Sequence, residues 1–408
     1  MSVVRVELAF HERFYDEVSG LPWRLDLEDW DGADVRFINR VRKGASRHPV
    51  RFVEGGRFNY ALKQTSPEFA KREIENYRRV LALGLHALIP VGYAINKRDP
   101  ISVETPVGTM YEPDDAAFVV TALEERALPE SYLFRLDFRE ENARMIHDAV
   151  AQLFATLHAN GVYWGDASMA NLLVRFFKVR DERGRVRTEL KAVLADAETV
   201  EFLPEMSDAM REEELDFFFE SMRWMREDLT EEGVRVREAT GEKAMRRIRR
   251  EYERRYRLLK NVERFEEETG LNVRRTFGRV DYSRQLGSLK EQIEEHRWYL
   301  GERAGEETAL RTAARDWLEN VYKPIVAEFE KLRVFEYFPF TTASRLYLEI
   351  MGHKYFMSQE AGEDVGVKTA IVDYANKFHR EEKPKTLLER IGNVVSRFFK
   401  PLQKDEDE

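Results

Sequence analysis

The stretch GVYWGDASMAN, residues 161–171, decides how this chain is interpreted. It places Asp166 five residues before Asn171, directly after an apolar helical segment that ends at Leu157 and His158. An aspartate at the start of a short loop can accept the proton of a hydroxyl group, and an asparagine at its end can supply an oxygen ligand to a metal ion. The spacing therefore predicts a loop that carries two functional side chains.

Two other segments supply groups that fit such a loop. Downstream, the sequence AVLADAE at residues 192–198 predicts an apolar strand that ends in a carboxylate, Asp196. Upstream, NYALK at residues 59–63 predicts a strand that ends in Lys63, on the same strand face as Ala61. We expect both groups to face a common cleft.

Lysine, aspartate, asparagine and aspartate in this chain order are typical of kinase-type phosphoryl transfer. In that chemistry Lys63 would contact the nucleotide phosphates, and Asp166 would act as the catalytic base or orient the acceptor hydroxyl. Asn171 and Asp196 would hold Mg²⁺ through oxygen ligands, as hard cations prefer. The predicted cofactors are therefore ATP and Mg²⁺. A turn or helix-capping role is the alternative for each aspartate taken alone.

A lysine in this position needs a carboxylate partner from the following helix. Glu73 shares a helix face with Tyr77 and Val80, which should pack on the sheet, whereas Glu75 shares a face with Arg78. We expect Glu73 to pair with Lys63 and keep Glu75 as the alternative. Glu198 is left open between a third acidic group near the metal and a surface residue.

The nucleotide-binding loop departs from the glycine-rich pattern. Between the first two predicted strands the chain has only Gly44, surrounded by cationic residues that include Arg47. We expect Gly44 and Arg47 to cover the phosphates, since cationic side chains can replace backbone amides in this task. Residues 121–126 follow a buried strand and should form the hinge that contacts adenine through backbone groups.

Composition bounds the class of protein. The 408 residues are 43% hydrophobic and 35% charged, which indicates a globular chain of more than one domain. The net charge of −9 argues against a dedicated nucleic-acid binder. Cysteine is absent, which excludes disulfides and thiolate chemistry. With no signal-like N-terminus and no apolar run of membrane-spanning length, we expect a cytoplasmic protein.

The predicted fold class is α+β: a two-lobed core followed by an all-α region. We expect a β-rich N-terminal lobe with one long helix at residues 1–125, a catalytic segment at 126–204, a helical domain at 205–380, and an amphipathic helix with an acidic tail at 381–408. Residues 1 to about 34 are predicted to form a short strand followed by an irregular, aromatic-bearing arm. The other predicted strands are residues 34–41, 49–54, 57–64, 91–95, 117–123, 172–179 and 187–195. The predicted helices are residues 66–83, 140–159, 207–228, 238–268, 283–300, 305–332, 342–359 and 363–378. No internal repeat is apparent.

Residues 384–401 form a separate signal. Their apolar side chains fall on one helical stripe and basic side chains flank it, namely Leu387, Leu388, Ile391, Val394, Val395, Phe398, Phe399, Lys385, Arg390, Arg397 and Lys400. A basic amphipathic helix can bind an anionic membrane surface, which would make the protein membrane-peripheral, or pack on the helical domain or a protein partner. Packing is the commoner outcome.

These motifs resemble the protein-kinase-like superfamily over residues 34–203, and most closely its small-molecule and sugar-lipid branch, whose loop reads His-Gly-Asp-x-x-x-x-Asn. The strings SRHPVRFV, YALK, GVYWGDASMANLL, LADAETVEF and FPFTTASRLYLEI look like an uncharacterised bacterial family described as lipopolysaccharide-kinase-like, over most of the chain. The resemblance implies a phosphotransferase whose acceptor is a small molecule, a sugar or a lipid-linked sugar; a protein acceptor stays open.

Three departures from the superfamily pattern affect this expectation. Trp164 replaces a histidine, so the hydrogen bond that orients the loop is expected to be missing. Gly165 replaces the arginine through which phosphorylated activation loops act, and Asp196-Ala197-Glu198 replaces Asp-Phe-Gly. Gly165 and Asp196-Ala197-Glu198 argue against regulation through the activation loop and the Phe-based switch. Trp164 and the missing glycine-rich loop favour the alternative function, a pseudokinase-like module that binds nucleotide or recruits a partner without turnover. The Lys63, Asp166, Asn171 and Asp196 set favours an enzyme.

Overall fold

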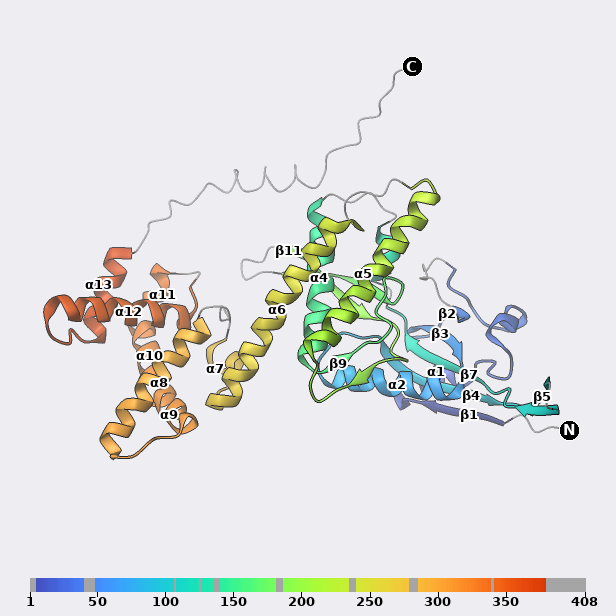
Figure 1. The fold of residues 1–408 in the computed structure, drawn as a ribbon, viewed down its shortest axis with the longest axis horizontal. Helices are drawn as coiled ribbons and strands as arrows, with labels where there is room; N and C mark the ends of the chain where they lie inside the picture. Colours follow the sequence, from blue (N-terminus) through green and yellow to red (C-terminus); the bar gives the residue numbers. More distant parts are fainter. Residues whose placement is uncertain are drawn as a thin grey trace, which may run out of the picture. The chain divides into compact units, whose positions relative to one another are not determined.

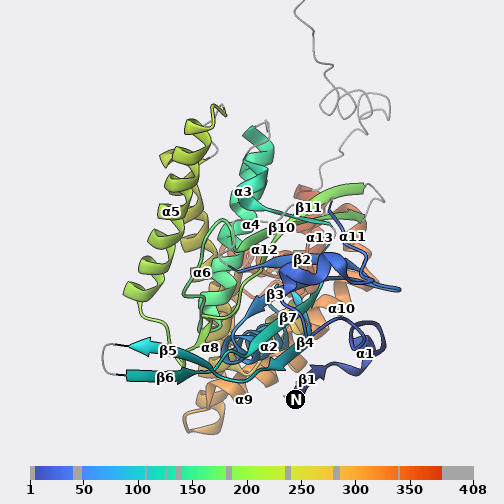
Figure 2. The ribbon, with the colours of Figure 1, turned by 90° about the vertical axis from the view of Figure 1, so that its right-hand side faces the viewer.

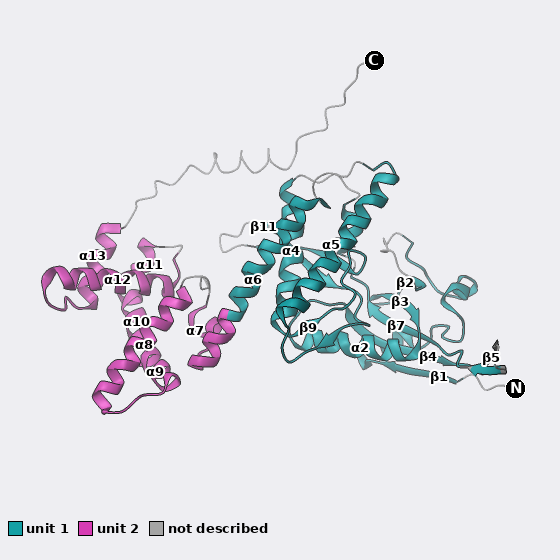
Figure 3. Ribbon diagram, viewed as in Figure 1, with its two compact units in different colours: residues 1–260 teal, residues 261–408 magenta. Residues whose placement is uncertain are grey.

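The chain consists of two compact units, residues 1–260 and residues 261–408 (Figure 3). The computed structural model describes residues 5–39, 48–105, 108–124, 126–134, 140–180, 186–234, 240–278, 285–338 and 341–378. The predicted phosphate-covering residues Gly44 and Arg47 and the C-terminal segment 384–401 lie outside the described residues. The two units are described separately below.

A five-stranded antiparallel sheet forms the first half of unit 1 (Figures 1 and 2). Its strand order is β1-β4-β7-β3-β2, and the strands are β1 (Arg5–Phe10), β4 (Ile89–Lys97), β7 (Ala116–Ala122), β3 (Asn59–Thr65) and β2 (Val50–Glu54). A separate hairpin of β5 (Ile101–Thr105) and β6 (Gly108–Glu112) connects β4 to β7. This sheet makes up the N-terminal lobe.

Strand alternation gives the sheet two different buried faces. On one face Leu62 and Phe118 pack against the aromatic N-terminal arm, which contains α1 (Glu12–Val18), a 3₁₀ helix at Leu27–Gly32 and the buried Trp30. On the other face Val119 packs against α2 (Pro67–Ala82). Helix α2 begins where Ser66 caps it by accepting a hydrogen bond from the Phe69 amide, with proline at the first helical position.

Of the strand predicted at residues 34–41, residues 34–39 are described, and they do not form a strand; residues 40 and 41 lie outside the described residues. Phe37 makes only an isolated bridge to Val53 of β2, supported by two backbone hydrogen bonds, from Ile38 to Phe52 and from Glu54 to Arg36. The sheet gains its fifth strand from the N-terminus instead, because β1 pairs along its whole length with β4. The hairpin β5–β6 was not predicted.

The second half of unit 1 is built on helix α4 (Glu140–Ala159), whose apolar side forms the centre of the largest core. The predicted hairpin is confirmed as β10 (Leu172–Arg180) and β11 (Val186–Leu194), paired in register throughout. The short elements β8 (Ala127–Pro129), α3 (Glu130–Leu133), β9 (Val162–Tyr163) and β12 (Glu201–Phe202) complete this lobe. Main-chain bonds from Leu88 and to His86 join the end of β11 to the start of β4.

The boundary between the units differs from the expected division at residues 204/205. Helices α5 (Asp208–Glu231) and α6 (Glu242–Thr269) follow the catalytic segment, and the boundary falls inside α6. Phe218 and Met222 of α5 and Ile248 of α6 are fully buried in the same core as α4. Because these helices bury their apolar sides against α4, they belong to the C-terminal lobe.

Unit 2 is entirely helical in its described residues and has a core of its own. Its helices after α6 are α7 (Val273–Phe277), α8 (Gln285–Ala304), α9 (Leu310–Trp317), α10 (Lys323–Lys331), α11 (Val334–Tyr337), α12 (Ala343–Ala361) and α13 (Val367–Phe378). The helix predicted at residues 305–332 is interrupted by a π-helical turn at Leu318–Tyr322, which ends two residues before Pro324. Proline cannot donate the backbone hydrogen bond that an uninterrupted helix requires.

Unit 2 contains an internal repeat, which corrects the expectation that none exists. Residues 296–316 read HRWYLGERAGEETALRTAARD, and residues 353–373, which lie 57 positions later, read HKYFMSQEAGEDVGVKTAIVD. The first copy contains the end of α8, a turn and α9; the second contains the end of α12, a turn and α13. The helix ends, the turns and the burial pattern of the two copies coincide position by position, with a single exception in burial.

The two copies share their stabilising contacts. In each, a histidine in the first helix bonds an aspartate in the second: His296 Nε2 lies 2.7 Å from Asp316 Oδ1, and His353 Nε2 lies 2.6 Å from Asp373 Oδ2. Gly305 and Gly362, with φ of 71° and 73°, end the first helices in the left-handed conformation that glycine adopts without strain. The signal was weak in the sequence because most matches are substitutions within one chemical class.

No helix within the described parts of the chain is both long enough and apolar enough to span a bilayer.

Candidate functional site

Lys63 reaches the site because of its place in β3. Tyr60 and Leu62 point to the face covered by the N-terminal arm, so Lys63 points to the opposite face, toward α2. Its Nζ lies 3.2 Å from Glu73 Oε2. Glu73 lies on the buried side of α2, whereas Glu75 is exposed and lies 3.8 Å from Arg78. The structure thus places Glu73, and not Glu75, next to the lysine.

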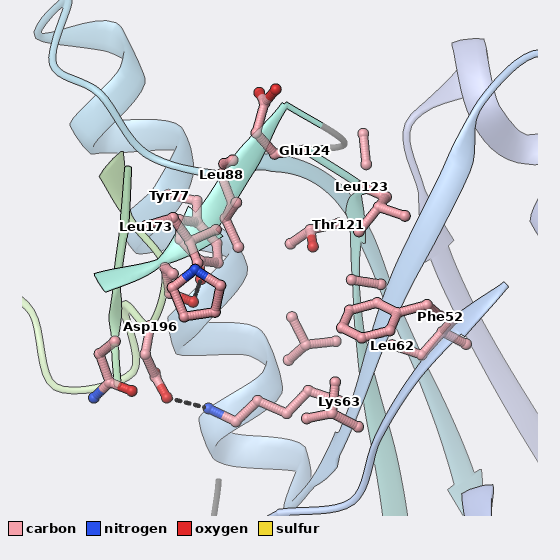
Figure 4. A pocket seen from close by; sticks show the side chains of 18 of the residues that line it. Phe52, Leu62, Lys63, Tyr77, Leu88, Thr121, Leu123, Glu124, Leu173 and Asp196 are labelled. Atoms are coloured by element: carbon pink, nitrogen blue, oxygen red, sulfur yellow. Dashed lines mark hydrogen bonds and ion pairs between the residues drawn. The ribbon is translucent and has the colours of Figure 1, made fainter. Parts of the chain in front are cut away.

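Two further carboxylates surround the same amine. Lys63 Nζ lies 2.8 Å from Asp196 Oδ2 and 2.9 Å from Glu198 Oε2, and Figure 4 shows the lysine extended toward Asp196. Glu198, which the sequence left open, therefore belongs to the site. Oxygen atoms of Glu73, Asp196 and Glu198 all lie within 4.8 Å of one another. One cation serves three carboxylates, so the site has a surplus of negative charge.

Burial changes the acidity of these groups. It raises the pKa of Glu73 to about 7, with a further contribution from the negative charge of Asp196, while Lys63 opposes the change. Burial also raises the pKa of Asp196, again opposed by Lys63. Burial alone would lower the pKa of Lys63, but the neighbouring carboxylates raise it above its ordinary value. The lysine is therefore charged at neutral pH.

Asp166 and Asn171 are held to each other. The Asn171 amide nitrogen donates to the Asp166 backbone carbonyl and to its carboxylate, both at 3.0 Å. The backbone carbonyl of Asn171 in turn accepts a hydrogen bond from the backbone amide of Ala195, one residue before Asp196. Asn171 and Asp196 line one pocket with Lys63. The loop of residues 161–171 and the segment around Asp196 thus meet beside the lysine.

Trp164 supplies the hydrogen bond that was expected to be missing. Its indole Nε1 donates to the backbone carbonyl of Asp196 at 2.7 Å, and the side chain is fully buried. An indole N–H is a donor only, so it can orient this carbonyl without depending on a tautomer. The expectation drawn from the absent histidine was wrong, because the tryptophan places a donor at the required position.

Gly165 is required by its surroundings. Its φ of 83° is a conformation that side chains rarely adopt, and a Cβ atom there would lie 3.0 Å from the carbonyl oxygen of Thr199. The Thr199 hydroxyl donates to the Trp164 carbonyl at 2.8 Å. Any other residue at this turn, directly before Asp166, would be strained.

Sequence reasoning missed Glu214, whose side chain bonds the backbone of the loop 161–171. Its Oε1 accepts the backbone amides of Trp164 at 2.6 Å and Gly165 at 2.7 Å, and its Oε2 lies 2.6 Å from Nε2 of His158. Glu214 lies in α5 and is almost completely buried. A carboxylate one turn before Phe218 on an apolar helix face was the signal that could have revealed it.

The pocket has apolar walls between the two lobes. In Figure 4, Phe52 lies on one side and Leu88 and Leu173 on the other, with Lys63 and Asp196 at one end. Thr121, Leu123 and Glu124 of the predicted hinge also line it; Glu125 lies outside the described residues. Apolar walls with backbone groups at one end and charges at the other suit a flat aromatic base joined to phosphates.

Glu130 gives a prediction about stability. It follows Pro129, a pocket residue, is fully buried, and neither of its carboxyl oxygens has a hydrogen-bond partner among the described residues. Burial raises its pKa to about 8, from 4.5. The folded state therefore binds this proton more tightly than the unfolded chain, in which the pKa is about 4.5. The resulting stabilisation is fully present below about pH 4.5 and is lost as the pH rises through about 8.

We therefore expect Glu130→Gln, which does not titrate, to gain stability relative to wild type between about pH 5 and pH 8.5, by up to about 4 kcal/mol. Urea unfolding at the two pH values measures the difference. Glu75→Gln, at an exposed position, is the matched control and should show no such trend. Parallel pH curves for Glu130→Gln and wild type would show that Glu130 does not titrate in this range.

Together these features define a protein-kinase-like fold: a five-stranded lobe with α2, a helical lobe that carries the loop, and a pocket between them, followed by an all-α unit. The order of Lys63, Glu73, Asp166, Asn171 and Asp196 along the chain matches that fold.

The comparisons with known proteins give these results. Residues 306–378 match a domain of unknown function, DUF4032, which covers the second repeat of unit 2 and part of the first. No curated protein matches the chain. Among solved structures, WaaP in complex with acyl carrier protein is similar at 17% identity and a TM-score of 0.36, over 64% of this chain and 93% of that chain. The Rio2 kinase of Chaetomium thermophilum, in its ADP/Mg²⁺-phosphoaspartate complex, is similar at 12% identity and a TM-score of 0.28, over 54% and 72%.

Proposed function

We propose that the chain is an ATP- and Mg²⁺-dependent phosphotransferase that transfers the γ-phosphoryl group to a hydroxyl of a small molecule, a sugar or a lipid-linked sugar. One observation carries the proposal: Lys63, Asp196 and Asn171 line one pocket, and Asn171 is bonded to Asp166. These groups come from three separate segments of the chain, around Lys63, in the loop 161–171 and around Asp196. A purely structural role for each would not require them to meet.

The donor set fits the proposed cofactors. A carboxylate from Asp196 and an amide oxygen from Asn171 are hard ligands, which suit Mg²⁺. The surplus negative charge around Lys63 would repel a free nucleotide, so a divalent cation supports binding here by neutralising phosphate charge. Lys63 is the cation that remains for the phosphates, and Glu73 is the partner that keeps it extended.

The residues of the chain position the reactants and accept one proton, that of the acceptor hydroxyl. The acceptor oxygen bonds to the γ-phosphorus while the bond from that phosphorus to the β–γ bridging oxygen breaks and ADP leaves. Asp166 orients the acceptor hydroxyl and takes its proton. Glu214 and Asn171 hold the loop so that Asp166 keeps its position.

The class of acceptor is inferred from residue 165 of the loop 161–171. Gly165 occupies the position of the arginine that binds a phosphorylated activation loop in regulated protein kinases, which favours an enzyme without that form of regulation. This supports a small-molecule or sugar acceptor over a protein. A panel of hydroxyl-bearing acceptors assayed with ³²P-labelled ATP tests the class. Labelling of protein substrates alone would overturn it.

A binding test distinguishes the enzyme from a nucleotide-binding module. We expect ATP to raise the melting temperature with Mg²⁺ and to do so much less without it. Lys63→Ala should lower ATP affinity roughly tenfold to a hundredfold, since hydrogen bonds to charged groups contribute about 1.5–3 kcal/mol, and it should also lower turnover. Lys97→Ala, at an exposed lysine of the same sheet, is the control.

Two results would contradict the proposal in different ways. Binding of ATP by wild type without phosphate transfer or hydrolysis across the acceptor panel would favour the pseudokinase-like module. Equal ATP affinity for Lys63→Ala and wild type would show that the pocket is not the nucleotide site.

A further inference from the structure

A buried chain of hydrogen bonds runs from α6 to the loop that carries Asp166. The Tyr252 hydroxyl of α6 lies 2.6 Å from Nη1 of Arg211 and 2.7 Å from Nδ1 of His158. His158 Nε2 lies 2.6 Å from Glu214, which accepts the two loop amides before Asp166. Tyr252, His158 and Glu214 are all buried. Every link in the chain is therefore shielded from water.

When Glu214 is a carboxylate and the His158 ring carries one hydrogen, one arrangement of donors and acceptors satisfies the chain. Arg211 has donors only, so the Tyr252 oxygen accepts from it. The Glu214 carboxylate accepts, so Nε2 of His158 carries the hydrogen and donates it. Nδ1 then has a lone pair, which accepts the hydroxyl hydrogen of Tyr252. The hydroxyl of Tyr252 satisfies the tautomer that Glu214 requires.

We propose that Tyr252 is a positioning residue for the catalytic loop: it holds the His158 ring in this tautomer and sets, through His158 and Glu214, the placement of the backbone that precedes Asp166. The effect of Tyr252 on turnover rests on the proposed phosphotransfer function. Its effect on the placement of the loop does not. The residue lies 86 positions after Asp166, on a helix that extends past the boundary of unit 1.

Removing this hydroxyl affects the loop selectively. In Tyr252→Phe the ring still fills its place in the core, but Nδ1 of His158 loses its donor and is left as a buried acceptor without a partner. The imidazole is then held only from the Glu214 side, and its displacement disturbs the bonds of Glu214 to the loop amides. The pocket walls and Lys63 are not part of this chain, so nucleotide binding should be unaffected.

The first test uses Trp164 as a reporter, because its indole bonds the Asp196 carbonyl and its amide bonds Glu214. The protein is labelled with 5-fluorotryptophan, and Trp164→Phe assigns one of the six ¹⁹F signals to this residue. We expect Tyr252→Phe to shift or broaden the Trp164 signal and to leave that of Trp317, in unit 2, unchanged. This readout requires no enzymatic activity.

Tyr256→Phe is the matched control. It lies one turn further along α6, its ring stacks on that of Tyr252 at 5.9 Å, and its hydroxyl makes no hydrogen bond within the described part of the chain. It should behave as wild type in the ¹⁹F spectrum. In kinetics, Tyr252→Phe should lower kcat roughly tenfold, the size of about 1.4 kcal/mol, with unchanged ATP affinity. A merely structural role would lower the melting temperature without this selective loss.

A double-mutant cycle tests the route through His158. In a His158→Gln background, Tyr252→Phe should have little further effect on the Trp164 signal or kcat, since the residue it acts through is gone. If Tyr252→Phe and Tyr256→Phe give the same Trp164 signal, or if the effects of Tyr252→Phe and His158→Gln add, the proposal is overturned. If no variant, wild type included, shows turnover, the proposed function fails while the ¹⁹F result still decides the role of Tyr252.

Discussion

Asp166→Ala should lower phosphotransfer by a factor of about 10² to 10⁴ while leaving ATP affinity within about twofold of wild type. A group that contacts only the acceptor hydroxyl contributes in the transition state and not to nucleotide binding. The structure supports this separation, because Asp166 is bonded to Asn171 but does not line the pocket that Lys63 and Asp196 share. Titration calorimetry with ATP and Mg²⁺, beside steady-state kinetics, measures the two effects.

Asp228→Asn, at an exposed position of α5, is the control and should match wild type in both assays. The assignment of Asp166 would be wrong if its replacement weakened ATP binding as much as Lys63→Ala does while turnover survived. That outcome would favour the nucleotide-binding module.

Asp196→Asn should abolish the part of ATP affinity that depends on Mg²⁺ and reduce turnover to background. The amide has nearly the same shape, and Trp164 bonds the backbone carbonyl of this residue, so the fold should persist. The side chain loses the charge that attracts a divalent cation. ATP affinity measured without Mg²⁺ should stay the same or rise, since one of three carboxylates around Lys63 is neutralised.

Affinity for ATP measured with Mg²⁺ and with EDTA, in wild type and variant, gives this result directly. Glu201→Gln, an exposed residue of the same segment, is the control. If Asp196→Asn retained the full enhancement by Mg²⁺, the metal would have to be held elsewhere, with Glu198 as the next residue to replace.

The elements that local pattern determines were predictable. The alternation of Tyr60, Leu62 and Lys63 indicated which way the lysine points, and the 3.6-residue period of α2 separated Glu73 from Glu75. The hairpin β10–β11 followed from two β-rich segments with a short connection. In each case the deciding residues are neighbours in the sequence, so propensity and periodicity carry the information.

The contacts that hold the loop were not predictable in this way. Glu214 and Tyr252 reach the loop region from 50 and 94 positions away from their partners Trp164 and His158. No local pattern specifies such distances. Trp164 was misjudged for a related reason: whether an indole can replace an imidazole depends on the position of the Asp196 carbonyl, which only the folded chain defines.

The domain boundary was missed because amphipathic helices do not indicate what they pack against. The apolar stripe of α5 suits a separate helical domain as well as the C-terminal lobe. Burial of Phe218 and Ile248 with α4 resolves the question in the folded protein. In the described part of the strand predicted at residues 34–41, only Phe37 pairs with the sheet, through a bridge to Val53 of β2.

The duplication in unit 2 has a consequence for its packing. Helices α8 and α12 contact each other, and each buries a matching pair of side chains in the shared core, Leu289 with Ile293 and Leu346 with Ile350. A single copy of the hairpin would expose this apolar face to water, so each copy supplies the surface that buries the other. Because both copies lie on one polypeptide, this association is intramolecular and occurs at high effective concentration.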